Sequence, residues 1–413
     1  MEAPRLYDPA RAETRVAFGV AEAEFAASTI ARATAEQMRA IVAVLAEARR
    51  EPAALLDEAS VDMLDVAQQV DYAQRAAVAD LAASIGMAEG TVWALARQGQ
   101  LLMQATPRVW ARFREGEFSA PNARRLADRV TEVSPERWYD LDAAVEQLGT
   151  LAPARFASWL NRIVEQLATE PLAVRHRRAE ERRCVTVEPE RDGMAWLGIH
   201  LSAANAAQVM SRLDADADHL ASLPDETRTR DQLRADVAVA LLLSTSATGS
   251  PVRATVSVTV PVLTLLGLSD EPGSLDGCTP IDPGTARELA ASAPSFHRIL
   301  THPITGAILD VDRTTYQVPA DLKRAVIARN PTCVFPGCGR HARRCDLDHT
   351  HAWADGGPTC LSNLRPLCTH HHRLKHLTTW RVTPTPTGVE WESPTGRIHH
   401  IDDPPPFCAR PPF

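Results

Sequence analysis

The stretch RNPTCVFPGCGRHARRCDLDHTHAWADGGPTCLSNLRPLCTHHHRLKH, residues 329–376, decides how the C-terminal part of this 413-residue chain folds. It contains five of the eight cysteines and seven of the fourteen histidines. Thiols and imidazoles at this density are typical of a metal site. We therefore expect a small domain whose fold depends on a bound metal more than on a large apolar core.

Two cysteine and histidine pairs in this stretch have the spacing of a zinc site. Cys333 and Cys338 lie on either side of a Pro-Gly turn, so both sulfurs can face one ion. Cys368 and His371 are three residues apart at an expected helix start, which places them on one helix face. Three thiolates and one imidazole suit tetrahedral Zn²⁺, and we predict a structural zinc site at these four residues.

A second polar cluster lies between and after these pairs. Residues 346–349 alternate like a strand that ends at Asp348 and His349. His372 follows His371 directly, and adjacent helical positions point about 100° apart. His371 can therefore face the zinc while His372 faces a different site. We expect Asp348, His349, Asn363 and His372 to form that site.

The other cysteines and the apolar segments indicate a reducing compartment. Cys345 and Cys360 are either small buried residues or replacements for one of the four zinc ligands. The first fifteen residues lack the pattern of a signal peptide. The most apolar run, residues 255–268, is interrupted by Pro261 and is too short to span a membrane, so it is interpreted as a buried strand. These features predict a cytoplasmic protein with no membrane partner, in which clustered cysteines bind metal and do not form disulfides.

Charge is distributed unevenly along the chain. The whole chain has a net charge of −8 and a pI of about 6.0, which is not typical of a nucleic-acid binder. Residues 321–381, however, carry ten Lys or Arg against four Asp, a net +6. The remainder therefore carries −14, so only this basic segment is expected to approach DNA.

The region upstream of the metal-rich stretch is predicted to be helical at first and then to contain both strands and helices. Residues 11–169 are alanine-rich with apolar residues at helical spacing, and helices are expected at 121–131, 135–148 and 153–168. Residues 184–187 and 194–200 predict two strands joined at Asp192-Gly193, followed by helices at 202–220 and from 229 onward. Short strands are expected around 380–382 and 389–391.

Two segments of this region have competing interpretations. Residues 79–102 fit a helix-turn-helix with its turn at Gly86, but an ordinary helical hairpin is favoured, because so short a pattern often arises by accident. The acidic Asp80 and Glu89 would also lie poorly against phosphates. The charged run at 175–183 is interpreted as a solvated helix face, with a phosphate-contact strip as the alternative.

The order Asp-His, Asn and His inside paired zinc ligands resembles an HNH endonuclease of the ββα-metal type. Residues 329–376 match it in their spacing, in the Gly356-Gly357 loop and in the segments NLRPLC and HHRLK. The upstream chain resembles domain-of-unknown-function family 222, through RTRDQLRADVAVALLL (228–243), TGAILDVDR (305–313) and WESPTGR (391–397). The expected fold class is α+β, with a mostly helical N-terminal region, a mixed α/β middle and a small zinc-stabilised ββα-metal domain. The expected boundaries are 1–170 for the helical domain, 171–268 for the mixed region of the same family domain, 269–320 for a linker with short structured pieces, 321–382 for the nuclease domain and 383–413 for strand fragments and a proline-rich tail.

The resemblance implies a metal-dependent DNA endonuclease that hydrolyses phosphodiester bonds. His349 would be the general base, since imidazole titrates near neutrality. Asp348 and His372 would hold one catalytic ion, Mg²⁺ or Mn²⁺, and Asn363 would orient His349 or complete the metal environment. Six basic residues would contact DNA phosphates: Arg340, Arg343, Arg344, Arg365, Arg373 and Lys375.

Two other functions compete with this hypothesis. The C-terminal unit would serve as a zinc-stabilised module that binds nucleic acid without cutting it, or the main function would lie in the N-terminal region as an interaction scaffold. The sequence leaves open the DNA site recognised, nicking or double-strand cutting, the catalytic metal, the oligomeric state and the biological context.

Overall fold

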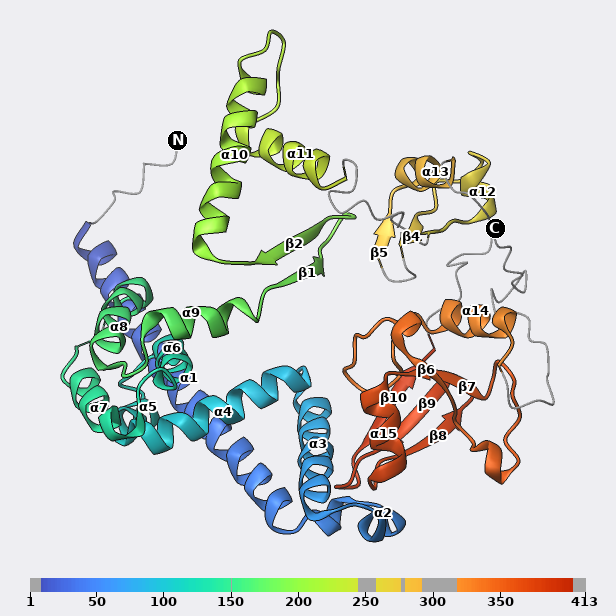
Figure 1. The fold of residues 1–413 in the computed structure, drawn as a ribbon, viewed down its shortest axis with the longest axis horizontal. Helices are drawn as coiled ribbons and strands as arrows, with labels where there is room; N and C mark the ends of the chain where they lie inside the picture. The colour runs from blue at the N-terminus through green and yellow to red at the C-terminus, as the bar shows by residue number, and fades with distance from the viewer. Residues whose placement is uncertain (1–8, 150, 244–257, 276–278, 292–317, 404–413) are drawn as a thin grey trace, which may run out of the picture. The chain divides into compact units, whose positions relative to one another are not determined.

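A computed structural model describes residues 9–149, 151–243, 258–275, 279–291 and 318–403 of the chain. The chain forms two compact units. The first contains residues 1–169 together with 299–413, and the second contains residues 170–298. The helical region and the metal-rich region, for which separate domains were expected, thus belong to one unit (Figure 1).

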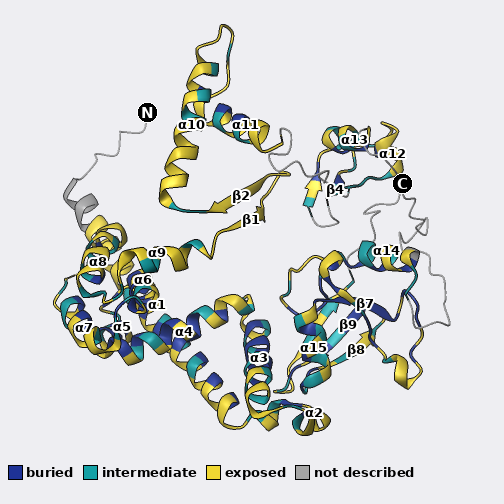
Figure 2. Ribbon diagram, in the orientation of Figure 1, coloured by how far each residue is buried: buried dark blue, intermediate teal, exposed yellow. Residues whose placement is uncertain are grey.

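The N-terminal part of the first unit is helical, as its alanine-rich pattern predicts. Helix α1 buries Met38, Ile41 and Leu45 on one face, which is the spacing seen in the sequence. Most of the later helices bury apolar residues in the same core (Figure 2). The helices are α1 (Pro9–Arg50), α2 (Glu58–Met63), α3 (Val66–Ile85), α4 (Glu89–Ala105), α5 (Pro107–Arg114), α6 (Ala120–Val130), α7 (Trp138–Glu146) and α8 (Pro153–Leu167), with 3₁₀ turns at Pro52–Leu55 and Pro135–Arg137.

Helices α3 and α4 form a helical hairpin whose turn is made by Gly86. This glycine has φ +65°, in the left-handed region that ends many helices, and its N–H donates to the carbonyl of Ala82. Helix α3 is buried on two sides: Val78 belongs to the helical core, whereas Ala76 and Ala79 belong to the core of the C-terminal part. The small alanine side chains let the backbone approach both cores closely.

The C-terminal part of the first unit begins with helix α14 (Ala320–Arg329) and a connecting segment over residues 331–345 that carries three cysteines. Strands β6 (Asp346–His349) and β7 (Leu364–Leu367) then pair antiparallel, with Asp348 opposite Arg365, and helix α15 (Thr369–Leu377) packs against both strands. A second sheet follows in the order β10-β9-β8, from β8 (Arg381–Thr385), β9 (Gly388–Glu392) and β10 (Ile398–Asp402).

Large aromatic side chains fill the core of this part. Trp380 and Trp391 are among the largest fully buried side chains and pack edge-on against Phe335. Phe335 also stacks on His371 with 4.0 Å between ring centroids. The core is therefore built directly against one of the predicted zinc ligands.

The second unit contains the predicted hairpin of β1 (Cys184–Pro189) and β2 (Ala195–His200), with left-handed backbone at Asp192 and Gly193. Helices α9 (Leu172–Glu180), α10 (Ala203–Ala221) and α11 (Arg230–Leu243) flank it in sequence. Arg230 and Arg234 of α11 form ion pairs with Asp218 and Asp214 of α10. The remaining elements are β3 (Val258–Thr259), α12 (Val262–Leu265), β4 (Gly273–Leu275), β5 (Thr279–Ile281) and α13 (Pro283–Ala291).

One predicted strand needs correction, and two segments named in the sequence analysis lie outside the described residues. The apolar run at 255–268 is not a buried strand throughout: Val262–Leu265 is a helical turn that starts after Pro261, and Leu263, Leu266 and Leu268 are exposed. Strand β10 was not predicted. The segments 305–313 and 404–413 lie outside the described residues. Among the helices that the structure describes, none has the length and apolarity needed to cross a membrane.

Candidate metal centres

Four donor groups converge where the sequence predicts zinc. The sulfurs of Cys333, Cys338 and Cys368 and a ring nitrogen of His371 all lie within 4.8 Å of one another. The Nδ1 atom of His371 lies 3.2 Å from Cys368 Sγ and 3.6 Å from Cys333 Sγ. Bond lengths typical of zinc at tetrahedral angles give about 3.5 Å between such sulfur and nitrogen ligands. The donor set and its dimensions thus fit one zinc ion.

The two remaining cysteines of this stretch lie outside the quartet. Cys345 and Cys360 are buried, and Cys345 packs into the same aromatic core. Burial raises the pKa of Cys345 to about 11, so it remains a neutral thiol at working pH. Cys360 lies 3.1 Å from the hydroxyl of Ser362.

A carboxylate from the N-terminal helices reaches the quartet of Cys333, Cys338, Cys368 and His371. Glu89, in the first turn of α4, lies 2.6 Å from Nε2 of His371 and 2.9 Å from Nε2 of His370. Burial alone would raise the pKa of Glu89, but the hydrogen bonds to the two imidazoles hold it down at about 2. No local sequence pattern predicts this contact, because Glu89 and His371 are 282 positions apart.

A second donor group forms on the other side of α15. Asp348 Oδ1 lies 3.3 Å from Nε2 of His372 and 3.4 Å from Nε2 of His376, and these three residues make a second group able to hold a metal ion. Asp346 adds a further carboxylate 3.4 Å from Nδ1 of His372. His372 and His376 are one helical turn apart, so their i, i+4 spacing could have identified His376 as a partner.

Lys375 neutralises Asp348 inside this group. Its ammonium donates to Asp348 Oδ2 and to the carbonyl of His349 at 2.7 Å. Burial would raise the pKa of Asp348, but hydrogen bonds with His372 and His376 and the charge of Lys375 hold it well below its usual range. Asp348 is therefore ionised at neutral pH, as a metal ligand requires. Lys375 points inward and does not belong with the exposed cations proposed to contact phosphates.

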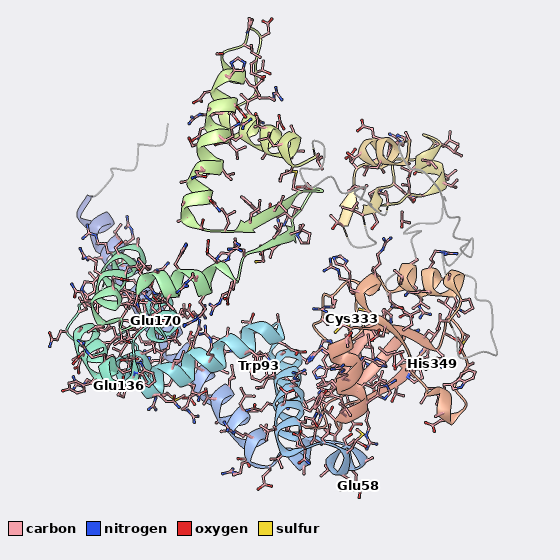
Figure 3. The ribbon with its side chains drawn as sticks, in the orientation of Figure 1. Glu58, Trp93, Glu136, Glu170, Cys333 and His349 are labelled. Atoms are coloured by element: carbon pink, nitrogen blue, oxygen red, sulfur yellow. The ribbon has the colours of Figure 1, made fainter. Side chains whose placement is uncertain are left out.

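His349 points away from this donor group. Successive strand residues face opposite sides, so Asp348 faces α15 while His349 faces the loop that follows β6. There its Nε2 lies 3.0 Å from the hydroxyl of Thr359, and its ring lies 5.9 Å from that of Trp353. Burial lowers the pKa of His349, which favours the neutral imidazole. Figure 3 labels His349 and Cys333, which both lie in the C-terminal part.

Asn363 braces the loop between the two strands. Its amide donates to the carbonyls of His351 and Pro358, and its oxygen accepts from the backbone N–H of His351. The structure thus shows Asn363 bonded to backbone groups, and its predicted roles, orienting His349 or completing the metal environment, stay predictions. Asn363 fixes the loop that immediately follows His349.

The six predicted phosphate contacts divide into exposed and buried residues. Arg340, Arg343, Arg344 and Arg373 are exposed. Arg365 is buried and donates to Asp403 at 3.1 Å and to the carbonyl of Ser362 at 3.0 Å. It therefore forms a structural ion pair with Asp403 and does not contact phosphates. The sequence of β7 could not predict that Arg365 is buried, because all four residues of this strand are buried and no exposed face sets Arg365 apart.

Comparison with known proteins places most of the chain in a larger group. The family model described as "Domain of unknown function (DUF222)" matches residues 23–330, which end just before the first cysteine of the quartet. The uncharacterized protein Rv3776 of Mycobacterium tuberculosis is 30% identical over 341 residues, which cover 72% of this chain and 65% of that protein. The chain thus spans just under two thirds of that relative's length. The uncharacterized protein Rv2100 of the same species is 28% identical over 389 residues, covering 78% of this chain and 68% of that protein. No solved structure matches the chain.

Proposed function

The chain belongs to the DUF222 family, whose function is unknown, and we propose from the C-terminal site itself that it is a metal-dependent DNA endonuclease of the HNH type. The observation that carries the proposal is the division of labour on α15. His371 joins the three cysteines, while its neighbour His372 joins Asp348. The strand-strand-helix order of β6, β7 and α15 suits a ββα-metal unit held by one structural zinc ion.

In the proposed reaction, His349 is the general base. The neutral imidazole accepts a proton from the attacking water, and burial keeps it neutral. When Nε2–H donates to Thr359, the lone pair lies on Nδ1, which is then the proton acceptor. Asn363 holds the loop after His349 and so keeps this ring in a constant position.

Asp348, His372 and His376 would hold the catalytic cation. When bound, a divalent ion would neutralise the scissile phosphate and stabilise the departing oxygen. Two imidazoles beside one carboxylate favour Mn²⁺ over Mg²⁺, which prefers oxygen ligands. Lys375 lies on Asp348 and supplies a positive charge to the same site.

DNA would be bound by the exposed cations around this site. Arg340, Arg343, Arg344 and Arg373 provide contacts to phosphates, which give affinity without sequence preference. Arg365 and Lys375 are left out of this set because their side chains point into the protein.

A second candidate function is a module that binds DNA without cutting it. The contact between Lys375 and Asp348 favours it, because the ammonium already neutralises the carboxylate that would hold the ion. The two candidates differ in whether DNA is cleaved when a metal is supplied.

A nicking assay on supercoiled plasmid separates them. Purified protein, freed of loosely bound metal, is incubated with plasmid in EDTA, Mg²⁺ or Mn²⁺, and the nicked and linear products are quantified. The nuclease proposal expects cleavage that requires metal and is faster with Mn²⁺. Retarded but intact DNA with every metal would reject the nuclease and support the binding module.

A further inference from the structure

The contact between Glu89 and His371 joins helix α4 to helix α15 at the proposed zinc site. Glu89 lies in the first turn of α4, and its side chain is 19% exposed. Each carboxylate oxygen has its own partner: Oε1 faces His371, and Oε2 faces His370. A helix of the N-terminal family region therefore contacts a residue that the DUF222 match does not include.

The two nitrogens of His371 have different partners. Nδ1 faces the sulfurs of Cys368 and Cys333, and Nε2 faces Glu89. A neutral imidazole carries one N–H, so a ring that ligates zinc through Nδ1 must carry its proton on Nε2. A carboxylate that accepts this proton fixes the tautomer and the orientation of the ring.

The distances favour hydrogen bonds over a second shared ion. Nitrogen and oxygen ligands of one tetrahedral zinc ion lie about 3.3 Å apart. Glu89 lies closer than this to both imidazoles, at 2.6 Å and 2.9 Å. These separations are typical of charge-assisted hydrogen bonds.

Packing around this contact holds the carboxylate in place. Ala76 and Ala79 of α3 are fully buried against the aromatic core beside the quartet. The indole N–H of Trp380 donates to the carbonyl of Ala76 at 3.3 Å, and the hydroxyl of Thr395 donates to Asp80. The packing of the α3–α4 hairpin against the C-terminal part thus places the Glu89 carboxylate beside His371.

We propose that Glu89 is a positioning residue of the zinc site: it accepts the Nε2–H of His371, aims Nδ1 at the three thiolates and so makes zinc retention depend on the docked α3–α4 hairpin. The inference depends on the structural zinc of the proposed function but not on cleavage. It gives the family region a role in holding the C-terminal unit in its metal-bound form.

The test is zinc affinity in the full-length chain, measured by competition with a chromophoric chelator. Glu89→Ala removes the acceptor, whereas Glu89→Gln keeps an amide oxygen that can still accept from His371. Loss of such a contact lowers metal affinity about 10- to 100-fold, so Glu89→Ala is expected to fall in this range and Glu89→Gln between it and wild type. Circular dichroism checks folding, and if Glu89→Ala does not fold, Glu89→Gln carries the test.

Thr395→Val is the matched control. It removes the hydrogen bonds of this hydroxyl with Asp80, Ser393 and Arg397 in the same packed surface without touching His371, and its zinc affinity should stay close to wild type. With Co²⁺ in place of zinc, Glu89→Gln should retain the absorption of a site with three thiolates and one nitrogen, because the ligands themselves are unchanged.

Three results would overturn the inference. Wild-type zinc affinity in both Glu89 variants would show that the carboxylate does not position His371. An equal loss in Thr395→Val would assign the effect to packing. A wild-type protein that binds no zinc would remove the structural zinc as well, while leaving the cleavage assay to decide the nuclease activity independently.

Discussion

Replacing Asp348 with asparagine removes the charge that joins the second donor group. Asp348 is buried and Lys375 is largely covered, with side-chain exposures of 6% and 11%. Removing one partner of such a pair leaves an uncompensated buried charge, at a cost of about 3–5 kcal/mol. Lys375 keeps its hydrogen bond to the carbonyl of His349. We therefore expect the lower end, a loss of about 3 kcal/mol, which lowers the melting temperature by about 6–12 °C.

Urea unfolding of the zinc-bound protein without added Mn²⁺ or Mg²⁺, followed by tryptophan fluorescence, measures this loss, because Trp380 and Trp391 lie in the core of the same part. Asp346→Asn is the matched control: it lies two residues away on the same strand, its side chain is 53% exposed, and it should change the unfolding free energy little. In the double variant Asp348→Asn with Lys375→Met, part of the lost stability should return, since the unpaired cation is gone.

The stabilisation by added Mn²⁺ is a second measurement that tests the same variant. A ligand at 100 times its Kd stabilises a protein by about 2.7 kcal/mol. Saturating Mn²⁺ should stabilise the wild type in this way and have little effect on Asp348→Asn. Equal losses in Asp348→Asn and Asp346→Asn, with no recovery in the double variant, would refute the buried-pair account.

Three further predictions concern the base, the cations and a buried arginine. Burial lowers the pKa of His349 below its ordinary value of 6.5, so the neutral base persists as pH falls. The rate of single-turnover cleavage, measured across pH, should therefore fall to half at a pH below 6.5, and a midpoint above 6.5 would exclude His349 as the general base. Combined Arg340→Ala and Arg373→Ala should weaken binding to unrelated duplexes equally and reduce the slope of log affinity against log salt by roughly 1.8, measured by fluorescence anisotropy in EDTA; sequence-dependent losses would contradict a phosphate role. Asp403→Ala should cost about 2 kcal/mol in urea unfolding, because the Arg365 guanidinium would be left buried with only carbonyl acceptors; a neutral effect would show that Arg365 does not depend on this pair.

The local part of the candidate site could be predicted from sequence. The convergence of Cys333, Cys338, Cys368 and His371 followed from a turn and a helix start, and the structure brings the four together. The opposite orientation of His372 followed from helical geometry alone. Both inferences used residues close in sequence, where a turn or a helix fixes the separation of side chains.

The parts that depended on tertiary packing were missed. Glu89 reaches the quartet only because the hairpin packs against the aromatic core, and no local pattern encodes that contact. The direction of Arg365 depended on the coverage of both faces of β7. For the fold, the helices and the hairpin at Asp192-Gly193 were predicted correctly, whereas the run after Pro261 was not, since an apolar segment alone does not separate strand from helix.

The measurement that tests the central claim most directly is single-turnover plasmid nicking in Mn²⁺ by His349→Ala beside His351→Ala. His351 is exposed and lies two residues after His349, so its replacement shows the effect of removing an imidazole from the same loop without removing the proposed base. Removal of a general base slows a reaction by about 10²–10⁴-fold, and we predict that range for His349→Ala, with zinc content and DNA affinity unchanged and His351→Ala close to wild type. Cleavage by His349→Ala at the wild-type rate would contradict the assignment of this site as a nuclease centre.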